Sequence, residues 1–544
     1  MHLTSNEHPP LPHALTQWRT TLARTATDLV TEIMTNPRGT MSPSVYETAR
    51  LVRTAPWLDG HGDRCAYLLR TQRPDGWWGH PDGYDLVPTL SATEALLHEL
   101  DRPATDPARP PAAPLARAAL TGLWALADRL DLDTDHQNAV PDTIAAELII
   151  PWLIDELNSQ LASSDGRLGA AALHLPHGID RHPLTRLRTA AAARTPLPEK
   201  LWHTLEALGE QAADAPGVRL TASAVGSSSA ATAAWLAGRP PQEAPAALLA
   251  RTQARWGGPV PGVLSIAVFE RAWVLGFLLD AGIPLTIPPE LPAYLETSLD
   301  TAGAPAGPGL PPDSDDTAAV LHTLALTGRP TPVHCLWPYE ADTYFRCFPG
   351  ERTPSTSTNA HILEALLTTA PPDEPAEEQT RRRTAADKTE TWLLNQQHHN
   401  GSWDDKWHAS PYYATMCCTV ALARGHHPRT HDALTRAGQW ALDTQRPDGS
   451  WGRWEGTVEE TSYALQILLR AHPDDLPPPV VRAVTDGCTH LLDHQDDADF
   501  APLWHDKDLY TPVTVVKAAR VAALYTAASR LEQAARPAAP AFLP

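Results

Sequence analysis

Apolar residues recur at steps of three and four along most of the chain, and this period constrains the fold more than any other feature. The helical period is clearest near the start, in a stripe formed by Leu15, Trp18, Leu22, Ala26, Leu29 and Ile33. No segment shows a convincing alternation at period two, and most of the 54 prolines fall between the stripes, where they end helices. The sequence therefore predicts an all-α protein of many short helices.

Proline-rich spacers divide this chain of 544 residues, which at roughly 150 residues per domain is long enough for several domains. Hydrophobic residues make up 42% of the chain, enough for sizeable cores. The segment 284–312 combines prolines and glycines with little apolar periodicity, and it is the best candidate for a domain boundary.

The charge and the apolar runs exclude several functions. Lys and Arg number 43 against 64 Asp and Glu, and the formal net charge of -21 repels phosphate backbones, so no nucleic-acid partner is expected. No run approaches the roughly 18 apolar residues of a membrane helix, so stable membrane insertion is not expected. The first residues lack the basic-then-apolar order of a secretory signal, and a cytoplasmic location is expected.

A short motif, QxxxGxW, occurs three times, at 72–78, 397–403 and 445–451. Each copy follows an apolar helical segment. The glycine permits a tight reversal, the tryptophan can stack beneath the next helix, and the glutamine amide can satisfy backbone groups at a helix end. Repeats that tie one helix pair to the next suit a closed α/α barrel, so we expect these motifs to build the fold without doing chemistry.

The sharpest local cluster of acidic residues is Asp313-Ser314-Asp315-Asp316, a DxDD pattern between two prolines and the helical stripe that starts at Thr317. Taken alone, the pattern is also what helix capping and the helix dipole favour. DxDD together with the QxxxGxW repeats resembles the class II terpene cyclases, and more closely the bacterial diterpene cyclases of the copalyl diphosphate synthase type. Further matches follow in the family's order at Ser44–Ala49 (SxYDTA, with Glu47 in place of Asp), Phe269–Trp273, Ser357–His361 and Trp504–Tyr510.

This resemblance implies two α/α-barrel domains in the βγ arrangement, with the γ domain inserted after the first helix of the β domain and the active site between them. It assigns residues 1–39 to the first β-domain helix, 40–290 to the γ domain and 291–544 to the β domain that carries DxDD. The boundary near residue 290 agrees with the spacer at 284–312.

The resemblance also implies a reaction: protonation of the terminal alkene of geranylgeranyl diphosphate and closure to a bicyclic copalyl-type (labdane) diphosphate, with the diphosphate retained. Asp315 is then the acid, while Asp313 and Asp316 tune and reprotonate it. Asn359 matches the family's asparagine that hydrogen-bonds the acid. Farnesyl diphosphate, giving a drimane-type product, is the alternative substrate, because cavity depth cannot be read from a sequence. A class I terpene synthase would act downstream, and a homodimer is left open.

The proposed acid needs an unusual pKa. An ordinary Asp with a pKa of about 3.9 is protonated in roughly one molecule in a thousand at pH 7, a deficit of about 4.2 kcal/mol. Burial and like charges raise a carboxyl pKa, whereas the helix N-terminus lowers it. We expect burial and repulsion to prevail over the helix dipole at this position.

Two further groups of residues are assigned by position. Carbocations need dry walls with π faces, each worth up to about 2 kcal/mol when desolvated. For the diphosphate end, Lys507 is the preferred direct contact, and Arg271 is a second candidate that could instead pair with Glu270. The aromatic residues that flank the motifs, and so are candidates for the walls, are Trp337, Tyr344, Trp407 and Tyr412.

A magnesium site is expected at Asp142 and Glu147, which resemble the DxxxxE motif of bacterial members. Carboxylates suit Mg²⁺, which also binds substrate phosphates. Five helical steps turn about 500°, so the two side chains converge only where the first turn is distorted, as Pro141 favours. A capped surface helix is the alternative interpretation.

Other functions fit the sequence less well. A class I terpene synthase would need an aspartate-rich DDxxD on a helix, and squalene-type cyclases are longer and carry an apolar membrane-binding patch. An α/α-barrel glycosidase also uses paired carboxylates and remains the alternative from another class, followed by a non-catalytic helical scaffold.

Overall fold

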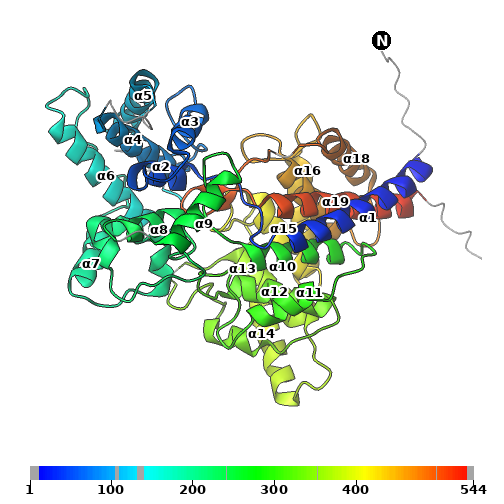
Figure 1. Cartoon of the computed structure of the whole chain (residues 1–544). Coiled ribbons are helices and arrows are strands. Elements are labelled where there is room, and N and C mark those ends of the chain that lie inside the picture. The colour runs from blue at the N-terminus through cyan, green and yellow to red at the C-terminus, as the bar shows by residue number, and fades with distance from the viewer. Residues whose placement is uncertain are drawn as a thin grey trace, which may run out of the picture.

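The structure is a computed structural model, and it describes residues 11–103, 110–131, 140–239, 242–351, 353–497 and 499–535. It is almost entirely helical, which confirms the all-α prediction (Figure 1). Within these ranges the strands are limited to an antiparallel hairpin of β1 (Trp504–His505) and β2 (Leu509–Tyr510). No helix in the described ranges is both long and apolar enough to cross a membrane.

Six helices form a closed inner ring in the C-terminal half. Each packs against the next, and the last packs back on the first. Their first turns meet at one end of the ring and their last turns at the other, so all six run in the same direction. In ring order they are α10 (Ala267–Asp280), α12 (Ser314–Leu326), α13 (Thr356–Thr368), α15 (Pro411–Leu422), α17 (Val458–Ala471) and α19 (Val513–Ala534).

An outer layer of helices covers this ring, and one continuous apolar cluster fills both layers. Its members are α1 (Leu11–Thr35) on α19, α11 (Glu290–Ser298) and η2 (Val333–Tyr339) on α12, α14 (Ala376–Gln396) on α13, α16 (Thr430–Asp443) on α15 and α17, and α18 (Pro478–Asp493) on α17 and α19. An inner ring inside an outer layer is an α/α barrel.

A second ring forms the N-terminal half around a separate apolar cluster. It closes through α2 (Val45–Thr54), α4 (Leu86–Asp101), α6 (Ala146–Ser163), η1 (Glu199–Asp214) and α8 (Ser229–Leu236). Around it lie α3 (His61–Thr71), α5 (Ala112–Asp131), α7 (His182–Ala192) and α9 (Glu243–Ala254).

The first and last helices lie side by side in the C-terminal half, where α1 runs along α19 (Figure 1). Residues 1–10 of the predicted first helix lie outside the described residues. Helix α10 falls within the predicted γ segment 40–290, yet it packs in the C-terminal ring, because its nearly all-apolar surface is buried against α12 and α19. The domain limits themselves remain predictions.

The three QxxxGxW copies share one geometry. In each, the glutamine Nε2 donates to the glycine carbonyl and to a carbonyl on a neighbouring helix, as Gln445 does to Gly449 and Ala483, both at 3.0 Å. The tryptophan Nε1 donates to the end of the preceding helix, as Trp451 does to Ala441 O at 2.6 Å. These contacts are structural, as the sequence predicts.

Candidate active site

The DxDD segment starts helix α12 at the end of the C-terminal ring where the first turns meet. Asp313 is the N-cap, and its side chain accepts a hydrogen bond from Asp316 N at 2.8 Å. Asp313 and Asp316 are buried, whereas the side chain of Asp315 is 17% exposed. Asp315 is therefore the carboxyl of the three that a ligand can reach.

Asp315 is paired with a histidine. His361, in the second turn of α13, places Nδ1 2.8 Å from Asp315 Oδ1, and its Nε2 lies 3.5 Å from the Sγ of Cys417. Burial lowers the pKa of His361, but the combined contacts with Asp315 and Cys417 raise it more, so the histidine pKa lies well above its usual range. His361 thus keeps a proton next to the acid at neutral pH.

The two flanking carboxyls also bind protons more tightly than an ordinary Asp. Burial, reinforced by the charge of Asp315, raises the pKa of Asp313 to about 7. Burial and the neighbouring Asp313 raise the pKa of Asp316 well above its usual range. Desolvation and repulsion thus outweigh the helix dipole at these two positions.

The expected hydrogen bond from Asn359 to the acid is wrong. Its Nδ2 donates to Phe345 O at 2.9 Å and Ser355 O at 2.8 Å, and its Oδ1 accepts from Phe345 N at 2.8 Å. The amide is saturated by backbone groups and fixes the segment before α13. His361, two residues later in the same motif, takes the place expected for Asn359.

Aromatic rings line the ring of helices beside the acid. Trp273 meets the His361 ring edge-on at 5.2 Å, and Tyr413 approaches it at 6.3 Å. Tyr413 then contacts further rings that come from other elements, namely His408 at 4.7 Å, Trp504 at 4.6 Å and Tyr463 at 5.4 Å. A cation formed near Asp315 would lie among electron-rich faces.

Three of the four predicted wall residues face elsewhere. Trp337 lies under the Arg381 guanidinium, and Tyr344 packs on Trp392, both partners being on outer helix α14. Tyr412 packs on Trp440 of outer helix α16. These residues join the two layers of the barrel, so their assignment to the cavity wall is corrected.

Trp407 differs, because its ring packs beside Phe348 and Lys406 and, within the described residues, forms no ring or cation pair with α14 or α16.

Lys507 is fully buried, which corrects its assignment as the direct diphosphate contact. Its Nζ donates to Glu47 at 2.5 Å, Glu206 at 2.8 Å and Ser228 at 3.0 Å. Three acceptors leave the ammonium no donor for a ligand. Lys507 instead joins the β1–β2 hairpin to the N-terminal half.

Arg271 is corrected in the same way. It donates to Ala267 O at 2.8 Å and Asn36 O at 3.3 Å and stacks over Tyr294. The guanidinium ties α10 to the segment after α1, and it is only 6% exposed.

Asp142 and Glu147, the two acidic residues of the DxxxxE motif, do not lie together on a regular helix. Asp142 precedes α6, Ala145 has a φ of 55°, and Glu147 falls in the first helical turn. Both carboxylates are exposed, and Asp142 accepts from Thr353 Oγ1 at 3.2 Å. Thr353 also accepts from Lys406 Nζ at 3.0 Å through its carbonyl, and this lysine, 11% exposed, is paired with Glu351. The sequence offered no motif signal for Lys406.

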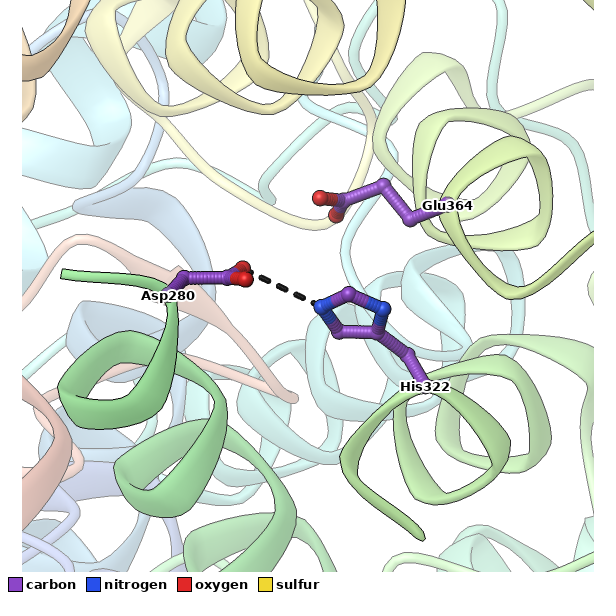
Figure 2. A group of neighbouring side chains, drawn as sticks. All are labelled: Asp280, His322 and Glu364. Carbon is purple, nitrogen blue, oxygen red and sulfur yellow. Dashed lines mark hydrogen bonds and ion pairs between the residues drawn. The ribbon is translucent and has the colours of Figure 1, made fainter. Parts of the chain in front are cut away.

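A second titratable cluster lies at the other end of the C-terminal ring, and Figure 2 shows its three members, Asp280, His322 and Glu364, pointing toward one another. Their ligand atoms lie within 4.8 Å of one another, as in a metal site. However, Arg424 pairs with Asp280 at 2.5 Å and also with Glu364. Because this guanidinium already binds both carboxylates, we interpret the cluster as an ion-pair network.

A closed α/α barrel with an accessible, imidazole-paired Asp among aromatic rings defines an enzyme class, the class II terpene cyclases, which start ring closure by protonating an alkene. Comparisons with known proteins agree. Residues 353–468 match the family model "Squalene-hopene cyclase C-terminal domain". The ent-copalyl diphosphate synthase of Streptomyces sp. (strain KO-3988) is 49% identical over 94% of this chain and 97% of its own.

Two other relatives point the same way. The labda-7,13-dienyl diphosphate synthase of Streptomyces clavuligerus is 41% identical over 91% of each chain. The solved structure of ent-copalyl diphosphate synthase from Streptomyces platensis superimposes with a TM-score of 0.87 at 46% identity, covering 93% of this chain and 99% of that one. The chain belongs to the bacterial copalyl diphosphate synthase family of class II diterpene cyclases. This membership removes the glycosidase and scaffold alternatives.

Proposed function

We propose that the protein cyclises geranylgeranyl diphosphate to a bicyclic copalyl-type diphosphate and leaves the diphosphate intact. The observation that carries this proposal is the His361–Asp315 pair, in which the one accessible carboxyl of DxDD lies against an aromatic pocket. The names of the bacterial relatives support a product of the copalyl or labdane type.

In the proposed mechanism, Asp315 donates its proton to the terminal alkene. The imidazolium of His361 lies 2.8 Å from the carboxylate that remains and stabilises it. Asp313 and Asp316 keep their protons, so charge develops only on Asp315. The rings of Trp273 and Tyr413 then face the cation while the remaining double bonds close the two rings.

For the diphosphate end, we propose Mg²⁺ at Asp142 and Glu147 in place of a direct contact from Lys507. The donor set fits, because two exposed carboxylates offer hard oxygen ligands. When bound, Mg²⁺ would neutralise part of the diphosphate charge and hold the charged end away from Asp315.

The finer assignments belong to the same proposal. Farnesyl diphosphate remains the alternative substrate, with a drimane-type product. Because the product retains its diphosphate, a class I terpene synthase is the expected next enzyme. We also propose a cytoplasmic location and leave a homodimer open.

The test is incubation with each prenyl diphosphate plus Mg²⁺, then dephosphorylation and mass spectrometry. We expect a bicyclic C20 alcohol from geranylgeranyl diphosphate. A bicyclic product from farnesyl diphosphate alone would move the assignment to the C15 substrate. Linear alcohols from every chain length would refute the proposed reaction.

The metal assignment has its own test. Glu147→Ala should raise the Mg²⁺ concentration needed for half-maximal rate by about tenfold, as expected for a lost ligand or its support. Glu156, on the same helix but outside the motif, provides the control Glu156→Ala. If the Mg²⁺ requirement of Glu147→Ala equals that of the wild type, the motif is a capped surface helix and not a metal site.

A further inference from the structure

A buried carboxylate stands across the ring from the acid. Glu459 lies in the first turn of α17, which is three places from α12 in either direction around the six-helix ring. The first turns of α12 and α17 therefore face each other at the same end of the lumen. Glu459 is 1% exposed, and neither a motif nor the mechanism above uses it.

The hydrogen bonds of Glu459 are unevenly divided between its two oxygens. Oε1 accepts from Trp504 Nε1 at 2.7 Å, Tyr463 OH at 2.9 Å and His408 Nε2 at 3.2 Å. The His408 proton is on Nε2, because its Nδ1 accepts from Ser410 N at 3.0 Å. Oε2 is buried and has no hydrogen-bond partner within the described part of the chain.

A bare carboxylate oxygen in a dry site is costly unless something binds it. The three donors fix the side chain through Oε1, so Oε2 is held in place without being used. A positively charged ligand would satisfy it, and a carbocation cascade forms such a ligand.

A set of buried aromatic rings connects Glu459 to the acid. Tyr413 contacts the ring of His361 on one side, and the rings of His408, Trp504 and Tyr463 on the other. The last three are the donors to Glu459. Asp315 and Glu459 thus lie on opposite sides of the lumen, at the two edges of the same set of rings.

We propose that Glu459 Oε2 is the base that ends the cascade, an inference that rests on the proposed cyclase reaction. Oε2 takes a proton from a carbon next to the final cation. The C–H bond breaks, its electron pair becomes the new C=C bond, and an O–H bond forms on Glu459. With the proton that Asp315 gave at the start, the atoms balance as an isomerisation.

Other groups in the pocket are less suited to this step. His408 has its one basic nitrogen occupied by Ser410 N. Asp316 also has a buried oxygen without a hydrogen-bond partner among the described residues, but burial and Asp313 raise its pKa well above the usual range and favour its protonated form. The side chain of Asp313 already accepts from Asp316 N. Glu459 is therefore the better-suited acceptor among these groups.

The test is Glu459→Gln, which keeps the shape and an acceptor for the three donors, assayed with geranylgeranyl diphosphate and Mg²⁺ with full product analysis. We expect substrate still to be cyclised, with the wild-type alkene formed roughly 100-fold more slowly. Alcohols from water capture, or rearranged alkenes, should replace it. Glu459→Asp should restore part of the wild-type product, a recovery that a purely structural role would not give.

Glu460→Gln is the matched control, because that carboxylate is bonded to Ser410, Arg453 N and Thr457 and faces away from the pocket rings. It should keep the wild-type product. Thermal melting checks that each variant is folded, and Glu459→Asp serves if the glutamine variant is not.

Two outcomes would overturn the inference: wild-type product at wild-type rate from folded Glu459→Gln, or folded variants that no longer consume substrate at all. Failure of the cyclase proposal itself is separate, since it would appear as linear alcohols from the unmodified enzyme.

Discussion

The two ends of the C-terminal ring each hold a histidine paired with an aspartate, and they differ in the charges that surround the pair. At the acid end, His361 lies 2.8 Å from Asp315, and two further carboxyls stand beside it. At the far end, His322 lies 3.1 Å from Asp280, and a permanent cation, Arg424, bonds to that aspartate.

This difference reverses the proton affinity of the carboxyls. At the far end burial opposes ionisation, but the charges of His322 and Arg424 outweigh it and lower the pKa of Asp280. At the acid end no arginine in the described part of the chain is bonded to Asp313 or Asp316, and burial raises the pKa of both. One pair therefore fixes an ion pair, while the other keeps protons available for transfer.

The strongest test of this difference between the two ends is to replace Asp315 and Asp280 in turn. Asp315→Asn should lower the cyclisation rate about 1000-fold, because the amide cannot donate the starting proton as an acid. Asp280→Asn should leave the rate close to wild type. Product formation measured by mass spectrometry decides, and equal losses in the two variants would mean that Asp315 is not special.

The two histidines form the second matched pair. His361→Asn should slow cyclisation about 100-fold, because the carboxylate left by Asp315 loses its cationic partner. His322→Asn should not. The wild-type rate should also fall in alkaline solution, where His361 loses its proton above its usual pKa range, and this limb should disappear in His361→Asn. A pH–rate profile unchanged by the substitution would contradict the pairing.

Replacing Arg424, the cation at the far end of the ring, tests the stability of the fold and not the rate of cyclisation. Arg424→Gln removes the ion pairs of Asp280 and Glu364 with the guanidinium and leaves Asp280 with His322 and the nearby Arg470. Since Arg424 is 21% exposed, we expect a loss of about 1–3 kcal/mol, less than for a fully buried pair. Urea denaturation measures it. The activity of the folded fraction should be unchanged, and an unaltered midpoint would show that the network adds no stability.

The last prediction concerns the pH dependence of stability and Asp313. The pKa of Asp313 is raised from 3.8 to about 7, so between these values the folded protein binds a proton that the unfolded chain has lost. Stability attributable to this group therefore falls as pH rises from about 4 to 7, by at most about 1.4 kcal/mol per pH unit.

Asp313→Asn removes this dependence, and asparagine can still cap α12. The free energy of unfolding of the variant, relative to wild type, should be higher at pH 8 than at pH 5. The same difference at both pH values would refute the assigned proton.

Sequence reasoning reached the acid motif because capping and chemistry place Asp313, Asp315 and Asp316 together in one short segment. It missed His361, although this residue lies within a matched motif, because the sequence around a single histidine on a helix does not show which side chain the histidine contacts. It also chose Tyr412 where Tyr413 faces the lumen. Consecutive residues of a helix are rotated by about 100°, so Tyr412 and Tyr413 lie on different faces of α15. Both side chains are apolar enough to be buried on either face.

The sequence by itself determined the helices, their ends and the QxxxGxW joints, because those depend on residues within one or two turns of each other. Tertiary structure alone decided what the charged groups do. Asp315 meets His361 from 46 positions away, and Lys507 meets Glu47 from 460 positions away. Such contacts arise only when the rings close and the two halves meet. Burial then decides which charges are neutralised and which proton stays free to move.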